Sequence, residues 1–186
     1  MEYDANGNIV RLAGMELAFD VENRLIELRH NEKGVEQYTY DMGNRRFWKK
    51  QPGDAEEFYL YGEDSRLLAV YQLTKKENKL EFELVDYNIY FTNRLLRSRD
   101  KAVILNRQHS VEMEIGRDGA QKTMFLPFGE EEVATEENCV KFGTYRRDVT
   151  SGLDYAKNLC VTRIGLLKDL FNVFGGVKCL NLRLSG

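Results

Sequence analysis

Apolar and polar residues alternate along most of this chain, in short segments that end in turn-forming residues. In the clearest example, residues 38–50, alternating aromatic side chains lead into Asp41, and the chain returns through Phe47 and Trp48 after a tight turn at residues 42–44. Side chains two positions apart lie on one face of a strand, and Asp, Gly and Asn are favoured in turns. The segment therefore predicts a β-hairpin.

The same hairpin pattern recurs along the chain. Further copies occupy residues 3–8, 19–25, 59–67 and, in a fainter form, 90–95. Asp4 and Asp20 are 16 positions apart, and steps of 21 positions lead from Asp20 to Asp41 and from Asp41 to Gly62. Such repetition is typical of an array of small units, each of which buries its apolar face by stacking on its neighbours. We therefore predict that the hairpins that turn at Asp41 and Gly62 lie side by side in one antiparallel sheet.

Most of the other segments also have the length and composition of strands. Large side chains alternate with smaller or charged ones on both sides of the turn at residues 22–23 and are expected to share one face of a sheet: Met15, Leu17, Phe19, Ile26, Leu28 and His30. Residues 75–79 are charged and are expected to form a solvated turn. Together these segments predict a mainly β fold, an antiparallel array of β-hairpins in a shell or a spiral sheet.

The end of the chain has a different pattern. Apolar residues recur there at helical spacing: Ile164, Leu167, Leu170, Phe171 and Phe174. A glycine pair at residues 175–176 follows, where a helix commonly ends. The tail therefore predicts a short C-terminal amphipathic helix whose apolar stripe packs into a core. The acidic segment 130–137 is expected to be an exposed loop.

Composition excludes several classes of protein. The 186 residues suit one domain, with 42% hydrophobic and 31% charged residues, and a net charge of −3 does not argue for nucleic acid or an anionic membrane as partner. The three cysteines, Cys139, Cys160 and Cys179, match neither a disulfide framework nor a zinc site. A polar N-terminus indicates no signal peptide, and no apolar run reaches membrane-spanning length, so the chain expressed alone is expected to be cytoplasmic.

The histidines and the first acidic turn do not form a convincing reactive site. The order and spacing of His109, Ser110 and Asp118 match no nucleophile motif, and His30 and His109 are both expected in a strand or turn. Residues 4–8 resemble a calcium loop only superficially, because the glycine comes too early and the distal glutamate is missing.

Asp148 and Asp154 are interpreted as turn and hydrogen-bonding residues that fix the local fold. We predict no catalytic, metal-binding or cofactor-binding residues, and no enzymatic activity.

The repeated unit resembles the YD repeat of bacterial Rhs proteins, because an aromatic-Asp pair, a short turn and an apolar strand follow one another. Residues 142–148 (Phe-Gly-Thr-Tyr-Arg-Arg-Asp) and 150–156 (Thr-Ser-Gly-Leu-Asp-Tyr-Ala) resemble the Rhs-repeat-associated core signature, and residues 126–131 resemble the element that precedes it. This resemblance divides the chain into YD-repeat hairpins at 1–95, a core-like region at 96–156 and a divergent tail at 157–186.

The resemblance implies a structural, non-catalytic fragment of an Rhs shell, a β-sheet cocoon that encapsulates a C-terminal toxin in interbacterial competition. Its partners would be the remainder of the shell or a toxin domain in cis, and the longer chain would be secreted or displayed at the cell surface. Such proteins release the toxin by autoproteolysis at Asp-Pro-containing motifs. This chain has no Asp-Pro pair and is predicted not to cleave itself.

The alternative is a carbohydrate- or surface-binding β-repeat module. Exposed Tyr and Trp side chains on hairpins can bind sugars, and Trp48 and Tyr59 are the first candidates. A glycan array with the wild-type chain and Trp48→Ala would separate the two interpretations.

Overall fold

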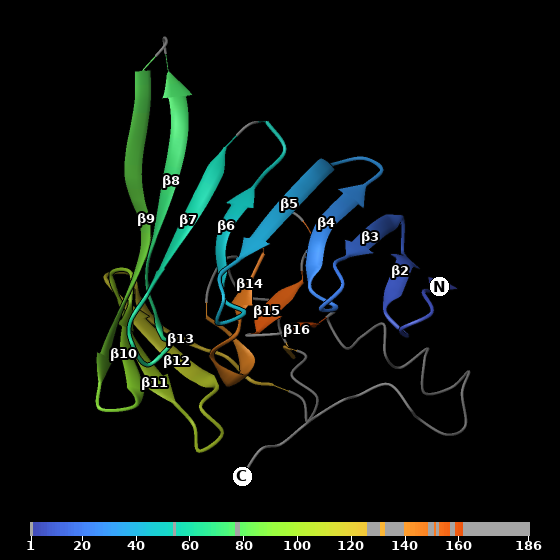
Figure 1. The fold of residues 1–186 in the computed structure, drawn as a ribbon. Coiled ribbons are helices and arrows are strands. Elements are labelled where there is room, and N and C mark those ends of the chain that lie inside the picture. Colours follow the sequence, from blue (N-terminus) through green and yellow to red (C-terminus); the bar gives the residue numbers. More distant parts are fainter. Residues whose placement is uncertain are drawn as a thin grey trace, which may run out of the picture.

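The structure of the protein, a computed structural model, describes residues 2–53, 55–76, 79–125, 131–132, 140–148, 151, 153–156 and 159–161. Nearly all regular structure in this part of the chain is β-strand, arranged in one large and one small antiparallel sheet (Figure 1). The predicted antiparallel hairpin array is therefore confirmed. The helix predicted over residues 164–174, and most of the acidic segment 130–137, lie outside the described residues.

The large sheet has thirteen strands, and every strand pairs with the next one in the sequence. The strands are β1 (Glu2–Tyr3), β2 (Ile9–Leu12), β3 (Met15–Phe19), β4 (Leu25–His30), β5 (Gly34–Tyr40), β6 (Arg46–Lys50), β7 (Glu56–Tyr61), β8 (Leu67–Lys76), β9 (Lys79–Phe91), β10 (Arg94–Ser98), β11 (Lys101–Leu105), β12 (Val111–Gly116) and β13 (Gly119–Lys122). The predicted hairpins at 41–44 and 62–65 join β5 to β6 and β7 to β8. These four strands are neighbours, which confirms that the two hairpins lie side by side.

The turn between β5 and β6 shows why the sequence forms hairpins. One carboxylate oxygen of Asp41 accepts the backbone N–H groups of Gly43 and Arg45, both at 2.9 Å. The N–H of Asn44 donates to the carbonyl of Asp41 at 3.0 Å, and Asn44 has a φ of 59°. This is a three-residue hairpin loop, a tight turn followed by one left-handed residue. Asn44, and not the neighbouring Gly43, occupies the left-handed position of this turn, because Asn tolerates that conformation better than most residues.

The same turn recurs in four other places. Its left-handed position is occupied by Gly7, Asn23, Ser65 and His109. The turn at residues 141–145 has the same backbone hydrogen bonds but two left-handed residues, Gly143 and Thr144. At the first turn, Asp4 accepts the backbone N–H groups of Asn6 and Asn8, so residues 4–8 form a hairpin turn as predicted. His109 is a turn residue, also as predicted.

Arginine side chains connect each turn to the next hairpin. Arg24 pairs with Asp20 of its own turn at 2.7 Å and donates to the side chain of Asn44 in the next turn at 2.8 Å. Its guanidinium lies 5.3 Å from the ring centre of Tyr40, whose hydroxyl donates to the carbonyl of Leu25 at 2.8 Å. The aromatic-Asp pair and the arginine of the repeat thus hold neighbouring hairpins together.

The equivalent arginines of the next two turns repeat this contact. Arg45 lies over Tyr61 at 5.3 Å, and Arg66 lies over Tyr90 at 5.4 Å. The array therefore has the same lateral connection at three successive steps.

A β-bulge follows most of these turns and changes which side chains are buried. In β4, Leu25 pairs with Phe19 and Glu27 pairs with Ala18, so Ile26 has no direct partner. Leu25 and Leu28 are buried, whereas Ile26 is 39% exposed. The prediction that Ile26 and Leu28 share one face is wrong, because the extra residue shifts the alternation.

The small sheet covers one face of the large sheet beside β4, β5 and β6 (Figure 1). It contains β14 (Arg146–Arg147), β15 (Asp154–Ala156) and β16 (Leu159–Val161), and a single 3-10 turn, η1 (Phe142–Thr144), precedes it. Leu153 packs against four buried residues of the large sheet: Met15, Leu25, Leu28 and Tyr38. We call this face of the large sheet the covered face and the opposite one the open face.

Two predicted boundaries fall inside these sheets. The division between residues 95 and 96 lies within β10, where the large sheet is continuous, and β16 belongs to the segment predicted to diverge. The division into three regions remains a prediction from sequence.

Candidate functional site

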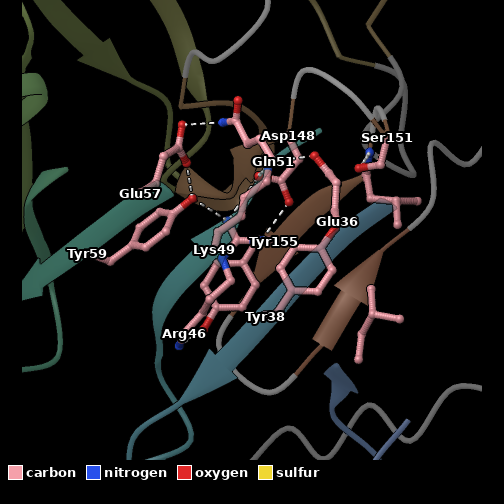
Figure 2. Close-up of polar contacts among 12 residues, drawn as sticks. Glu36, Tyr38, Arg46, Lys49, Gln51, Glu57, Tyr59, Asp148, Ser151 and Tyr155 are labelled. Atoms are coloured by element: carbon pink, nitrogen blue, oxygen red, sulfur yellow. Dashed lines mark hydrogen bonds and ion pairs between the residues drawn. The ribbon is translucent and has the colours of Figure 1, made fainter. Parts of the chain in front are cut away.

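Charged and tyrosine side chains are buried together between the covered face and the small sheet (Figure 2). We call this group the charged cluster. Its members from the large sheet are Glu36, Tyr38, Arg46, Lys49, Glu57 and Tyr59, and its members from the small sheet are Asp148 and Tyr155. Adjacent strands β5, β6 and β7 supply the first six, because inward-facing positions of neighbouring strands lie opposite one another.

Asp148 is the centre of the charged cluster. Both of its carboxylate oxygens accept hydrogen bonds from the guanidinium of Arg46, at 2.6 and 3.0 Å, and the ammonium of Lys49 lies 3.2 Å away. Burial raises the pKa of Asp148, but Arg46 and Lys49 outweigh that effect and lower the pKa to about 2. Asp148 is therefore ionised at neutral pH, although it is only 2% exposed.

Three tyrosine rings surround the guanidinium of Arg46. The ring centres of Tyr155, Tyr59 and Tyr38 lie 4.2, 4.7 and 5.3 Å from its central carbon. The backbone N–H of Arg46 also donates to the Tyr155 hydroxyl at 2.7 Å. Burial works against the charge, but Asp148 and the neighbouring tyrosines hold the pKa of Arg46 well above its ordinary value. A planar, weakly hydrated cation suits this site better than lysine would.

Each of two Glu-x-Tyr pairs contains a hydrogen bond from the tyrosine hydroxyl to the glutamate. The Tyr38 hydroxyl donates to Glu36 at 2.5 Å, and the Tyr59 hydroxyl donates to Glu57 at 2.5 Å. Glu36 also pairs with Lys49 at 2.9 Å. Burial raises the pKa of Tyr59 well above its ordinary value, so this hydroxyl keeps its proton and acts as a donor.

A second set of ion pairs holds the small sheet itself. Arg147 contacts Asp154 through two hydrogen bonds at 2.7 and 2.9 Å and contacts Glu131 at 2.5 Å. Glu131 also accepts from Lys141 at 2.8 Å. The predicted hydrogen-bonding role of Asp154 is confirmed. The prediction of an exposed acidic loop is wrong at Glu131, whose side chain is 4% exposed.

Asp148 has a wider role than the local one predicted for it. Its backbone N–H donates to the carbonyl of Leu153 at 2.8 Å, which is the expected turn contact. Its side chain, however, reaches Arg46 and Lys49, about a hundred positions earlier in the chain. Sequence reasoning did not single out these two cations. The available signal was that both occupy positions where neighbouring repeats have apolar residues.

The other candidate residues have structural contacts. His30 accepts the backbone N–H of Glu32 at 3.2 Å, and the buried hydroxyl of Ser110 accepts the N–H of Gly143 at 2.9 Å. Within the described ranges, no group of His, Cys, Asp or Glu could hold a metal ion, and no helix is long and apolar enough to cross a membrane.

The aromatic candidates for sugar binding lie on opposite faces of the sheet. Tyr59 is only 5% exposed and lies within the charged cluster, so the prediction that it is exposed is wrong. Trp48 is half-buried, and its indole N–H donates to Glu56 at 2.7 Å.

The fold and the charged cluster define a class of protein segment: a large sheet of consecutive antiparallel hairpins, covered on one face by a short strand-rich element. Two solved toxin structures are similar to this chain in fold. The pore structure of the Tc holotoxin of Photorhabdus luminescens, which carries a TccC3 mutation, matches 87% of this chain with 18% identity and a TM-score of 0.60. The crystal structure of TcdB2-TccC3-TEV matches 83% of it with 19% identity and a TM-score of 0.52.

These similarities establish the fold. The chain spans only 9% of the length of each matched toxin chain. No protein-family model matches the sequence, and no curated protein matches it.

Proposed function

We propose that this chain is a structural, non-catalytic segment of an Rhs/YD-repeat shell that encapsulates a C-terminal toxin in interbacterial competition. The observation that carries the proposal is the uninterrupted order of the thirteen strands, covered on one face by the small sheet. The small sheet contains the residues that resemble the Rhs-associated core. The similarity of most of the chain to Tc toxin chains supports the proposal.

The geometry suits such a role because a shell needs a large, continuous and closed wall rather than a reactive site. Arginine–tyrosine contacts between turns hold successive hairpins in the same relative position, and the charged cluster attaches the small sheet to the covered face. The partners in this proposal are the remainder of the shell and a toxin domain in cis. The complete protein would be secreted or displayed at the cell surface.

The isolated chain is expected to associate with itself. Among the residues that the structure describes, the large sheet ends at β1 and β13, and unpaired strand edges promote edge-to-edge pairing. Sedimentation velocity at roughly tens of micromolar should therefore show concentration-dependent oligomers. A single monomeric species across this range would contradict the proposal that both edges belong to a larger sheet.

Ala120→Pro provides a matched control for this experiment. The N–H of Thr123 donates to Glu112 in β12, and N–H groups alternate between the two sides of a strand. The N–H of Ala120 therefore faces the open edge, and proline removes it without removing a bond to β12. This variant should fold like the wild type and associate less.

The chain is also expected to remain intact during long incubation. The carboxylate of Asp148 is ionised and engaged with two cations, which makes it unsuitable as an acid on a peptide bond. Intact-mass spectrometry at neutral and mildly acidic pH should show one species of 186 residues. A reproducible cut within residues 156–186 that Asp169→Asn abolishes would contradict this; Asp169 lies outside the described residues.

A further inference from the structure

Equivalent positions of the hairpins differ in one informative way. The first covered-face position lies five residues after the first residue of each turn and is occupied in chain order by Ile9, Leu25, Arg46, Leu67 and Val111. The second lies eight residues after it and is occupied by Leu12, Leu28, Lys49, Val70 and Glu114. The hairpin of β5 and β6 thus carries two cations where the hairpins on either side of it carry apolar residues.

These positions belong to the interior of the protein. Leu28 and Val70 are 0% exposed, and Lys49, which occupies the equivalent position between them, is 2% exposed. Burying a cation at such a position is unfavourable unless a counter-ion is supplied. Glu114 is the other charged residue in the second set, and its partner is Lys101 of the neighbouring strand at 3.4 Å.

A single residue of the small sheet supplies the counter-ion for both cations. Asp148 contacts Arg46 and Lys49 and is itself 2% exposed. On the opposite strand of this hairpin, Glu36 occupies the position that Met15 has one repeat earlier, and it pairs with Lys49. One repeat later this position is Glu57, which accepts a hydrogen bond from the Tyr59 hydroxyl. Opposite charges therefore face each other at the hairpin of β5 and β6. The small sheet makes a second buried ion pair with the large sheet, between Arg146 of β14 and Asp86 of β9.

We propose that Arg46 and Lys49 determine where the small sheet docks: their charges select the hairpin of β5 and β6 over the neighbouring hairpins. The partner they recognise is the buried carboxylate of Asp148, which directly follows β14. Apolar contacts, such as those of Leu153 with Leu25 and Leu28, are non-directional and would allow docking at a neighbouring hairpin. Docking one hairpin away would place Asp148 against apolar residues, remove the carboxylate partner of Arg46 and leave Lys49 with Glu36 alone.

This inference rests on the proposed function in one respect, namely that the small sheet closes the covered face. Buried polar groups that fix register at some cost in stability are known from coiled coils. We therefore expect that replacing Glu36, Arg46, Lys49 and Asp148 together preserves the fold, but that the small sheet no longer docks at a single position. Removing one charge alone is a different experiment, because it leaves the others without partners.

The test compares the wild type with a charge-free variant, Glu36→Met, Arg46→Leu, Lys49→Val and Asp148→Leu, whose first three substitutions copy the neighbouring repeats. This variant also carries Asp86→Leu and Arg146→Leu, which remove the second ion pair between the sheets and should by themselves leave the wild-type distances unchanged. Pulsed electron paramagnetic resonance would measure distances from a spin label at Ser151 to labels at Glu22 and Glu63, in the exposed turns on either side, with the native cysteines replaced by serine. The wild type should give one distance for each pair. The charge-free variant should give additional distances shifted by about 10 Å, roughly two strand spacings.

A matched control removes a charge pair formed between two strands of the large sheet, Lys101→Met with Glu114→Leu, and should keep the wild-type distances. The exchanged pair, Arg46→Asp with Asp148→Arg, should restore a single distance that neither single substitution gives. Unchanged single distances in the charge-free variant, or failure of the exchanged pair to restore one, would overturn the proposal. Loss of folding in the charge-free variant would also overturn it, because the cluster would then supply stability and not selection.

The same measurement separates this proposal from the proposed function. The distances report where the small sheet docks in the isolated chain, whether or not the chain encloses another polypeptide. A single monomeric species in sedimentation would contradict the proposal that the chain is a shell segment. It would not affect the proposal on where the small sheet docks.

Discussion

Replacing Asp148 with alanine is expected to lower the free energy of unfolding by about 3 to 5 kcal/mol and to release the small sheet from the covered face. The substitution leaves Arg46 and Lys49 buried without their shared counter-ion. Denaturant unfolding measures the first effect, and hydrogen exchange of the amides in β14 and β15 measures the second. Asp118→Ala, in an exposed turn, should change the stability by less than about 0.5 kcal/mol.

The pH dependence provides an independent check of the same contact. The pKa of Asp148 is about 2 in the folded protein and about 3.9 in an unfolded chain. Its stabilising contribution is therefore fully present above about pH 4 and is lost as the pH falls towards 2. The difference in stability between the wild type and Asp148→Asn should shrink across that window. A difference that stays constant from pH 5 to about 2 would show that folding does not lower the pKa of this carboxyl.

Replacing Leu28 with alanine is expected to lower the free energy of unfolding by about 2 to 5 kcal/mol. Leu28 is fully buried and belongs to the apolar group that contacts Leu153 of the small sheet, so the shortened side chain leaves a cavity. Urea unfolding of the purified variant measures the loss. The small sheet should also become less protected in hydrogen exchange, because Leu153 loses one of its contacts.

Ile26→Ala is the matched control for this experiment, because both residues lie in β4 and are two positions apart. Ile26 is the extra residue of the bulge and is partly exposed, so its truncation should cost less than about 1 kcal/mol. Equal losses for the two variants would show that the bulge does not turn Ile26 away from the core.

The sequence by itself determined the repeating hairpins. A turn such as that of residues 41–45 is specified locally, since Asp41 accepts N–H groups two and four positions later and Asn44 tolerates a left-handed conformation. The regular spacing then placed successive hairpins side by side. These features were predictable because each depends on residues close together in the chain, and turn chemistry and strand periodicity express such interactions directly.

Only the tertiary structure decided which side chains face the core and what the buried charges do. Each bulge shifts the alternation by one residue, which exposes Ile26 and buries Leu25, and a simple period of two does not reveal this. The pairing of Arg46 with Asp148 joins residues 102 positions apart. A buried cation is stable only where the fold supplies its counter-ion, so the role of Arg46 depends on where the small sheet docks, which local sequence does not specify.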